Sequence, residues 1–296
     1  MAETRTFDDR DGWIWFDGKL VPWREANVHI LTHAMHYASS VFEGQRAYNG
    51  TIFKLTRHSE RLRKSAELLG FEIPWSVEQI DAACIEVLEA SGLKDAYMRP
   101  VAWRGSEQMG VSPKGTKPHL AIAAWHWGKY FDEAKARNGI RLDIAPWRRP
   151  APYTAPVHSK AAGLYMIATL SKQHADSRGF DDALMFDWRG QVAEATGANA
   201  FFVRDGKLFT PTPDCFLDGI TRQTVIELAR KRGIEVIEKA IWPDELESFE
   251  QFFLTGSAAE VTLVQSAGPW SFEIGEMSRQ LQRDYDDLVN GREMAV

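Results

Sequence analysis

The sequence is poor in cysteine and has no long apolar run. Cys84 and Cys215 are the only cysteines among 296 residues, and neither has a CxxC partner, which argues against a disulfide framework or a zinc knuckle. No stretch of about 18 apolar residues occurs, and the first residues, MAETRTFDDRDGW, have the features of neither a signal peptide nor a membrane anchor. We expect both cysteines to fill the core of a cytoplasmic protein that crosses no membrane.

The sequence also lacks an excess of positive charge, since 35 Lys and Arg face 41 Asp and Glu and the formal net charge is −6. A nucleic-acid or anionic membrane partner would require a basic stripe, so we expect neither partner. The one dense basic patch, Arg148-Arg149 in PWRRPAPYTAP, lies in a proline-rich stretch. We interpret this patch as a solvated hinge without a role in chemistry.

Turn dipeptides and helical periodicity predict an α+β domain over residues 1–127. Asp17-Gly18 and Asn49-Gly50 each stand between apolar, β-favouring residues, which is typical of tight hairpins. Helical patterns follow over 57–69 and in VEQIDAACIEVLEASG, and then AYMRPVAWR and HLAIAAWHW have the composition of strands. We therefore expect an antiparallel sheet with two helices.

The remaining sequence predicts a second, larger domain. Residues 128–138 are polar without a strong period and form a candidate interdomain loop, which leaves 139–296 for the C-terminal domain. The elements expected there are a helix over 161–175, antiparallel strands with turns at Arg189-Gly190 and Asp205-Gly206, and two helices, one after Thr221 and one around 277–288. The predicted fold class is α+β with two lobes.

Lys160 is the first candidate for chemistry. It leads into the mostly apolar segment KAAGLYMIATL, whereas most other lysines lie on polar helices or in turns. A buried lysine loses its charge more readily, and only a neutral amine attacks a carbonyl. The alternative for a lysine at this place is a solvated helix end.

The string AEATGANAF places Glu194 among small residues, between two predicted strands. Small residues let the backbone approach a flat ligand closely. A carboxylate in such an apolar setting is costly unless it meets a cation, and a protonated pyridine nitrogen is such a cation. The alternative is a turn glutamate in water.

Two strings offer backbone amides to an anion. In CFLDGITRQ, Gly219, Ile220 and Thr221 stand directly before a predicted helix, whose first N–H groups and dipole attract a phosphate. The alternative is that Thr221 serves as an ordinary helix N-cap. In LTGSAAEVT, the turn Gly256-Ser257-Ala258 again presents small residues after a strand, a signal that is weak by itself.

Aromatic and basic residues indicate a substrate pocket. THAMHYASSVFEGQRAY places Tyr37 and Phe42 near Gly44, and these rings can line an apolar pocket or belong to the core. The histidine pair in this string lacks a third ligand at metal-binding spacing, so no metal is expected. Tyr97 and Arg99 in AYMRP lie on one face of a strand, where they can hold a carboxylate unless that face is simply exposed.

Nine strings, taken in order, resemble those of a known enzyme family: HAMHYASSVFEGQRAY, SERLRKSAELL, YMRP, MGVSP, SKAAGLY, AEATGANAF, LFTP, GITR and TGSAAEV. They resemble the branched-chain amino acid aminotransferases, which are class IV aminotransferases of pyridoxal-phosphate fold type IV. The resemblance spans nearly the whole chain. It implies a small N-terminal α+β lobe, a larger C-terminal pseudo-barrel lobe and pyridoxal 5′-phosphate as the cofactor.

The resemblance also implies roles for the residues that contact the cofactor. Lys160 would be the Schiff-base lysine, Glu194 the partner of the pyridine nitrogen, and Tyr165 a neighbour of the phenolic oxygen, and these three would be catalytic. The further cofactor contacts that it implies, several of them to the phosphate, are Arg61, Leu217, Gly219, Ile220, Thr221, Gly256 and Ser257.

For the substrate, the resemblance implies that Tyr97 and the Ser257-Ala258 turn hold the α-carboxylate and that Arg99 receives the side-chain carboxylate of glutamate. The residues expected around an aliphatic side chain are Phe42, Gly44, Tyr130 and Tyr165, with Tyr37, Met109 and Val111 contributed by a neighbouring subunit. A homodimer would then be the smallest working unit.

The implied reaction is transamination between L-leucine, L-isoleucine or L-valine and 2-oxoglutarate, giving branched-chain 2-oxo acids and L-glutamate. Alternatives with the same fold are a D-amino acid or (R)-amine aminotransferase, against which Tyr97-x-Arg99 and Gly44-x-Arg46 argue, and aminodeoxychorismate lyase. A non-catalytic carboxylate-binding protein is the alternative outside the enzymes.

Overall fold

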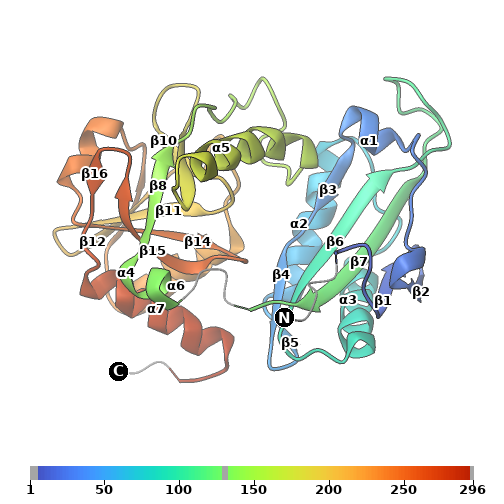
Figure 1. Cartoon of the computed structure of the whole chain (residues 1–296), viewed down its shortest axis with the longest axis horizontal. Helices are drawn as coiled ribbons and strands as arrows, with labels where there is room; N and C mark the ends of the chain where they lie inside the picture. The colour runs from blue at the N-terminus through green and yellow to red at the C-terminus, as the bar shows by residue number, and fades with distance from the viewer. Residues whose placement is uncertain (1–5, 129–132, 294–296) are drawn as a thin grey trace. The chain divides into compact units, whose positions relative to one another are not determined.

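The computed structural model describes residues 6–128 and 133–293, and they fall into two compact units (Figure 1). Unit 1 is drawn from Met1–Gly128 and Ser159–Gly163, and unit 2 from Lys129–His158 and Leu164–Val296. In the expected interdomain loop, residues 129–132 lie outside the described residues and Glu133–Asn138 form helix α4. We retain the division near residue 128 as a proposal, with Ser159–Gly163 assigned to the N-terminal domain.

Unit 1 contains an antiparallel sheet in the order β2-β1-β7-β6-β4-β5, with β3 paired to β6. The predicted hairpins are confirmed, because Asp17 and Asn49 adopt positive φ, each followed by a glycine that does the same, as type I′ turns require. The strands are β1 (Trp13–Phe16), β2 (Lys19–Pro22), β3 (Ser40–Phe42), β4 (Gln45–Tyr48), β5 (Thr51–Ile52), β6 (Ala96–Arg104) and β7 (Pro118–His126).

Helices α2 (Leu55–Leu68) and α3 (Val77–Ser91) pack beside each other and against this sheet, as Figure 1 shows. Helix α3 begins at a capping box formed by Ser76 and Gln79 and ends at Gly92, whose φ is +65°. Its residues Ile80, Cys84, Val87 and Leu88 form an apolar stripe that is buried against the sheet together with Leu62 of α2. A short helix α1 (His33–Tyr37) precedes β3.

Unit 2 contains a mixed sheet in the order β10-β9-β8-β15-β14-β11-β12-β13, so the expectation of a purely antiparallel sheet is wrong. The pairs β8–β9, β8–β15 and β12–β13 are parallel. Parallel neighbours need a long crossover, and helices α5 and α6 lie in the connections after β8 and β12. The strands are β8 (Ile140–Ile144), β9 (Asp182–Phe186), β10 (Val192–Ala195), β11 (Asn199–Arg204), β12 (Lys207–Pro211), β13 (Val236–Lys239), β14 (Gln251–Gly256), β15 (Glu260–Ala267) and β16 (Trp270–Ser271).

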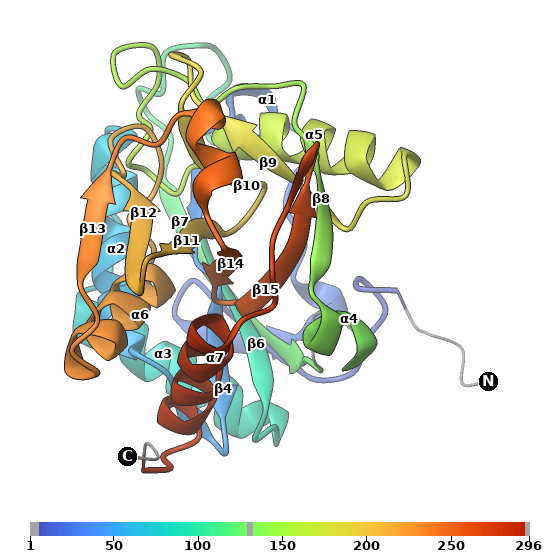
Figure 2. The ribbon, with the colours of Figure 1, turned by 90° about the vertical axis from the view of Figure 1, so that its left-hand side faces the viewer.

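The helices of unit 2 include α5 (Tyr165–Ser177), α6 (Ile220–Lys231) and α7 (Glu276–Val289). Helix α7 lies along β15 and α6 packs against β14, as can be followed in Figure 2. Helix α5 starts at Tyr165, not near residue 161 as expected. A single 3-10 turn, Ala162–Leu164, lies between Lys160 and the helix. Among the described residues, no helix is both long and apolar enough to cross a membrane.

Candidate active site

Lys160 is held in unit 1 by its backbone. Its N–H group donates to Ser65 Oγ on α2 (3.0 Å), and its carbonyl accepts from the N–H group of Phe42 at the end of β3 (3.1 Å). The Lys160 ammonium nitrogen lies 5.2 Å from the centre of the Phe42 ring. The lysine is therefore anchored on both sides, and its side chain borders an aromatic surface.

Tyr97 and Arg99 of β6 are in contact, as the sequence predicts. Arg99 Nη2 donates to Tyr97 Oη (3.0 Å), and the Arg99 guanidinium lies 4.5 Å from the centre of the Phe42 ring. A Cβ atom at Gly44 would lie 2.1 Å from Tyr97 Oη, so only glycine leaves room for the phenol. A phenol and a guanidinium joined in this way can hold a carboxylate.

The other predicted residues of unit 1 lie in three places. Arg61 of α2 donates two hydrogen bonds to Glu43, a contact that the sequence did not predict. Tyr37 ends α1, and Met109 and Val111 lie in the loop between β6 and β7; all three are exposed on the single chain. Tyr130 lies outside the described residues.

In unit 2, Glu194 of β10 is fixed by two side chains. Asn199 Nδ2 donates both to Glu194 Oε2 (3.1 Å) and to the Leu217 carbonyl (3.0 Å). Arg149 Nε lies 3.3 Å from Glu194 Oε1, an ion pair without the alignment of a hydrogen bond. The Asn199 amide thus ties the carboxylate to the loop that leads into α6.

Arg149 corrects the interpretation of the basic patch. Arg148 is exposed, but Arg149 is only 6% exposed, so its expected role as part of a solvated hinge is wrong. The N–H group of Arg149 donates to the Phe186 carbonyl (2.8 Å), which holds this loop beside the end of β9 and turns the side chain inward. A buried guanidinium requires an anion, and Glu194 supplies it.

The start of α6 has the character of an anion site. The N-cap is Gly219, which offers no side-chain cap, whereas Thr221 lies inside the helix and is buried. The alternative of Thr221 as the N-cap is therefore wrong. Arg222, 1% exposed, pairs with Asp218 (2.8 Å) and Glu238 (2.7 Å) and fixes the first turn. N–H groups at a fixed helix N-terminus attract an anion.

The turn after β14 comes close to the loop that follows Glu194 and strand β10. A Cβ atom at Gly256 would lie 3.1 Å from the Gly197 carbonyl and 3.4 Å from Ala198 Cβ. Thr255 is 1% exposed, and its hydroxyl has no hydrogen-bond partner within the described part of the chain. Small residues and an unsatisfied hydroxyl beside Asn199, the partner of Thr255 across the strands, are suited to a flat polar ligand.

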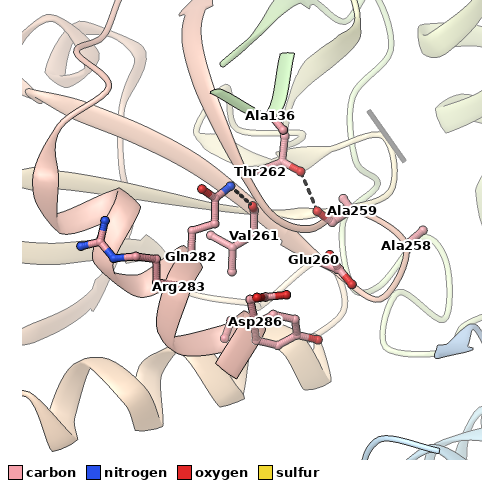
Figure 3. A pocket seen from close by; sticks show the side chains of 10 residues that line it. Ala136, Ala258, Ala259, Glu260, Val261, Thr262, Gln282, Arg283 and Asp286 are labelled. Atoms are coloured by element: carbon pink, nitrogen blue, oxygen red, sulfur yellow. Dashed lines mark hydrogen bonds between the residues drawn. The ribbon is translucent and has the colours of Figure 1, made fainter. Parts of the chain in front are cut away.

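The turn after β14 borders, through Ala258 and Ala259, a cavity of about 270 Å³ that is shown in Figure 3. Thr262 Oγ1 donates to the Ala259 carbonyl (2.6 Å), and Gln282 Nε2 of α7 donates to the Val261 carbonyl (2.9 Å). Both bonds fix residues that follow the Ser257-Ala258 turn. The residues that line the cavity are Ala136, Ala258, Ala259, Glu260, Val261, Thr262, Gln282, Arg283, Tyr285 and Asp286.

One group of metal-ligating atoms occurs among the described residues, formed by Asp187, Asp214 and Cys215 within 4.8 Å of one another. Arg189 donates to Asp187 (2.8 Å) and to Asp214 (2.7 Å) and therefore already supplies a cation to both carboxylates. Burial raises the pKa of the Cys215 thiol to about 12, which disfavours a thiolate ligand. We assign no metal to this group.

Comparison with known proteins identifies the family. The model of the family described as amino-transferase class IV matches residues 40–267. A relative from Pseudomonas aeruginosa, named a branched-chain-amino-acid aminotransferase, is 40% identical over 291 residues, covering 96% of this chain and 95% of that protein. The chain belongs to the branched-chain aminotransferases of class IV.

Solved structures of such aminotransferases share the fold. The branched-chain aminotransferase from Thermoproteus uzoniensis, solved with norvaline, is 36% identical, has a TM-score of 0.91 and matches over 96% of both chains. The branched-chain amino acid aminotransferase from Thermobaculum terrenum, solved in its PLP form, is 30% identical, with a TM-score of 0.88 over 96% of this chain and 95% of that one. Class IV aminotransferases use pyridoxal phosphate.

The sequence did not predict three side-chain contacts: the ion pair of Arg149 with Glu194, the ion pair of Arg61 with Glu43, and the hydrogen bond from His58 to Glu43. Glu43 offered a usable signal, because it directly follows the apolar pair Val41-Phe42, and a carboxylate must find a cation if it is buried. The partners of Arg149 and His58 lie at a distance in the sequence, and no local pattern pairs them.

Gly219→Ala is expected to lower the free energy of unfolding by about 1–3 kcal/mol. The added Cβ would lie 2.2 Å from Asn199 Oδ1, and moving Asn199 breaks its bonds to Glu194 and Leu217. Urea unfolding monitored by Trp fluorescence measures the change. Gly197→Ala is the matched control, since its Cβ would meet nothing within 4 Å. Equal stability of both variants would show that the Asn199 contacts are dispensable.

Proposed function

We propose that this protein uses pyridoxal 5′-phosphate to transfer the amino group between L-branched-chain amino acids and 2-oxoglutarate, giving branched-chain 2-oxo acids and L-glutamate. The observation that carries the proposal is the Asn199 amide, which joins the Glu194 carboxylate to the loop before α6. A cation-binding carboxylate and a helix N-terminus for an anion, tied by one side chain, match a pyridinium ring that bears a phosphate. The names of the relatives supply the substrate class.

The residues present fit this cofactor. Glu194 would hold the ring nitrogen, and the backbone N–H groups of Ile220 and Thr221 would hold the phosphate, assisted by Arg61 and the Gly256-Ser257 turn. In the fold, Leu217 and Gly219 place that helix start beside Asn199, and the lack of a side chain at Gly219 and Gly256 keeps the cradle open. When bound, the cofactor withdraws electrons from the substrate's Cα.

Lys160 is the residue to which we assign the proton transfers. Its amine would attach the cofactor and, once released, move a proton to and from the substrate's Cα as general base and general acid. Tyr165, the first residue of α5, would lie near the cofactor's phenolic oxygen. The backbone bonds of Lys160 to Ser65 and Phe42 restrict where its amine can reach.

The substrate's two ends require different partners. Tyr97 and the Ser257-Ala258 turn would hold the α-carboxylate, and Arg99 would hold the second carboxylate of glutamate. Phe42, Tyr165 and Tyr130 would enclose an aliphatic side chain. The Arg99 guanidinium already lies on the Phe42 ring, so one pocket combines an apolar wall with a cation.

Arg99→Met is expected to lower kcat/KM for glutamate by roughly 10- to 100-fold, because one charge-assisted hydrogen bond is lost, while kcat/KM for leucine changes by less than about threefold. Steady-state kinetics with both amino donors measures the ratio. A parallel loss for both substrates would place Arg99 at the α-carboxylate or in the scaffold instead.

A homodimer is the proposed working unit, with Tyr37, Met109 and Val111 completing the pocket of the neighbouring subunit. These side chains are 40%, 47% and 82% exposed on the single chain, so each is accessible to a neighbouring subunit. An apolar groove of about 350 Å³ opens in the same unit and is lined in part by Val28 and Met35, which are also exposed. Static light scattering that gave the mass of one chain would contradict this proposal.

The cytoplasmic location remains a prediction.

A substrate panel tests the proposed function. L-Leucine, D-alanine and (R)-1-phenylethylamine are supplied in turn with 2-oxo acid acceptors, and we expect only L-leucine to react efficiently with 2-oxoglutarate. A reaction with the D-amino acid or the amine alone would support the alternative aminotransferases of this fold. A purified protein that is colourless and free of cofactor would support the carboxylate-binding alternative.

A further inference from the structure

Glu43 is fully buried and accepts three hydrogen bonds from two side chains of α2. Arg61 Nε donates to Oε1 (2.7 Å), Arg61 Nη2 donates to Oε2 (2.8 Å), and His58 Nδ1 donates to Oε2 (2.7 Å). The side chains of Glu43 and His58 are 0% and 2% exposed, and that of Arg61 is 18% exposed. All three lie in unit 1.

In the Glu43–His58–Arg61 triad, burial and the neighbouring groups favour an ionised carboxylate at Glu43 and a neutral ring at His58. Burial acts to raise the pKa of Glu43, but the charge and hydrogen bonds of Arg61, followed by the hydrogen bond of His58, lower this pKa well below its usual value. Burial lowers the pKa of His58, which favours the neutral ring. A neutral imidazole whose Nδ1 faces a carboxylate carries its proton there, so His58 donates without adding charge.

The triad also adjoins the segment that carries Lys160. His58, Arg61 and Ser65 follow one another along one face of α2, and Ser65 accepts the N–H group of Lys160. Phe42, the residue before Glu43, donates its N–H group to the Lys160 carbonyl (3.1 Å). The N–H group of Glu43 donates to the Pro100 carbonyl (2.8 Å). The carboxylate is thus fixed to the same two elements as the lysine.

A bidentate contact sets the direction of a guanidinium. Glu43 occupies the edge of Arg61 formed by Nε and Nη2, and because the group is planar, Nη1 lies on the opposite edge. A buried ion pair adds little net stability compared with apolar side chains, but it restricts the orientation of both partners.

We propose that Glu43, supported by His58, is the positioning residue that aims the guanidinium of Arg61 at the cofactor phosphate. The proposal rests on the proposed function, in which Arg61 contributes to the phosphate site. Without the carboxylate, the long arginine side chain has many rotamers, and the cost of ordering it falls on ligand binding.

Glu43→Gln tests the proposal. The amide keeps the shape but can accept only one of the two Arg61 bonds well, so we expect affinity for pyridoxal phosphate to fall about tenfold or more. Affinity for pyridoxal, which lacks the phosphate, should stay within about twofold. Fluorescence titration of apoprotein prepared from the holoenzyme measures both affinities, and the ³¹P resonance of the bound cofactor should shift in the variant.

Glu60→Gln is the matched control, because Glu60 lies on the same helix, is exposed and faces Arg57 (3.8 Å); it should change neither affinity. If Glu43→Gln does not fold, His58→Asn and His58→Ala replace it: the asparagine retains a donor and should bind pyridoxal phosphate more tightly than the alanine, with equal affinity for pyridoxal. An equal loss for both ligands would overturn the proposal. Failure of the unmodified protein to bind pyridoxal phosphate would instead refute the proposed function.

Discussion

Lys160→Ala is expected to abolish the visible absorption band of the bound cofactor and to lower the rate of transamination by on the order of 10⁴-fold, since we assign the attaching amine and the proton transfers to Lys160. The fold should survive, because the contacts of Lys160 to Ser65 and Phe42 run through its backbone and are retained by alanine. Absorption spectra and single-turnover kinetics with L-leucine measure the two effects.

Lys172→Ala is the matched control for this prediction. Lys172 lies on α5 and forms an i,i+4 ion pair with Asp176, both partly exposed, so its loss should alter neither the spectrum nor the rate. Retention of the absorption band in Lys160→Ala would identify a different lysine as the site of attachment.

Glu194→Gln is expected to lower kcat with L-leucine by about 10²- to 10³-fold, because in the proposed site a neutral amide would not keep the ring nitrogen protonated and an aligned charge would be lost. Asn199 and Arg149 lose their anion at the same time, so cofactor affinity should also fall. Rapid-mixing kinetics and a cofactor titration measure both changes.

Glu235→Gln is the corresponding control, since Glu235 forms an exposed ion pair with Lys207 (2.8 Å) at the surface of unit 2. Glu194→Asp separates charge from position: it keeps the carboxylate but withdraws it by one methylene, and its kcat should lie between those of wild type and Glu194→Gln. A variant Glu194→Gln with unchanged kcat would remove this carboxylate from the mechanism.

Local sequence predicts the turns and helices of this protein well, for a physical reason. Asn49-Gly50 predicts a hairpin because Asn and Gly tolerate the positive φ that both residues adopt. Helix α3 is predicted by its apolar period and by Gly92, which ends it in the left-handed conformation. These features depend on the dihedral angles and spacing of neighbouring residues.

Strand direction in unit 2 was only partly predictable. The antiparallel pairs β9–β10 and β11–β12 follow from short connections at predicted turns. The parallel pairs join strands that are distant in sequence or separated by a helix, such as β8 with β15, and their pairing depends on packing of the whole sheet.

The chemistry divides in the same way. The sequence predicts an amine at position 160, a carboxylate at 194, and a phenol and a guanidinium at 97 and 99 as the groups that would meet a flat anionic ligand. Which cation neutralises which anion was decided only by the tertiary structure: Arg149 meets Glu194, and Arg61 meets Glu43. Side-chain identity is local, whereas an ion pair forms where packing excludes water from two groups that the sequence separates.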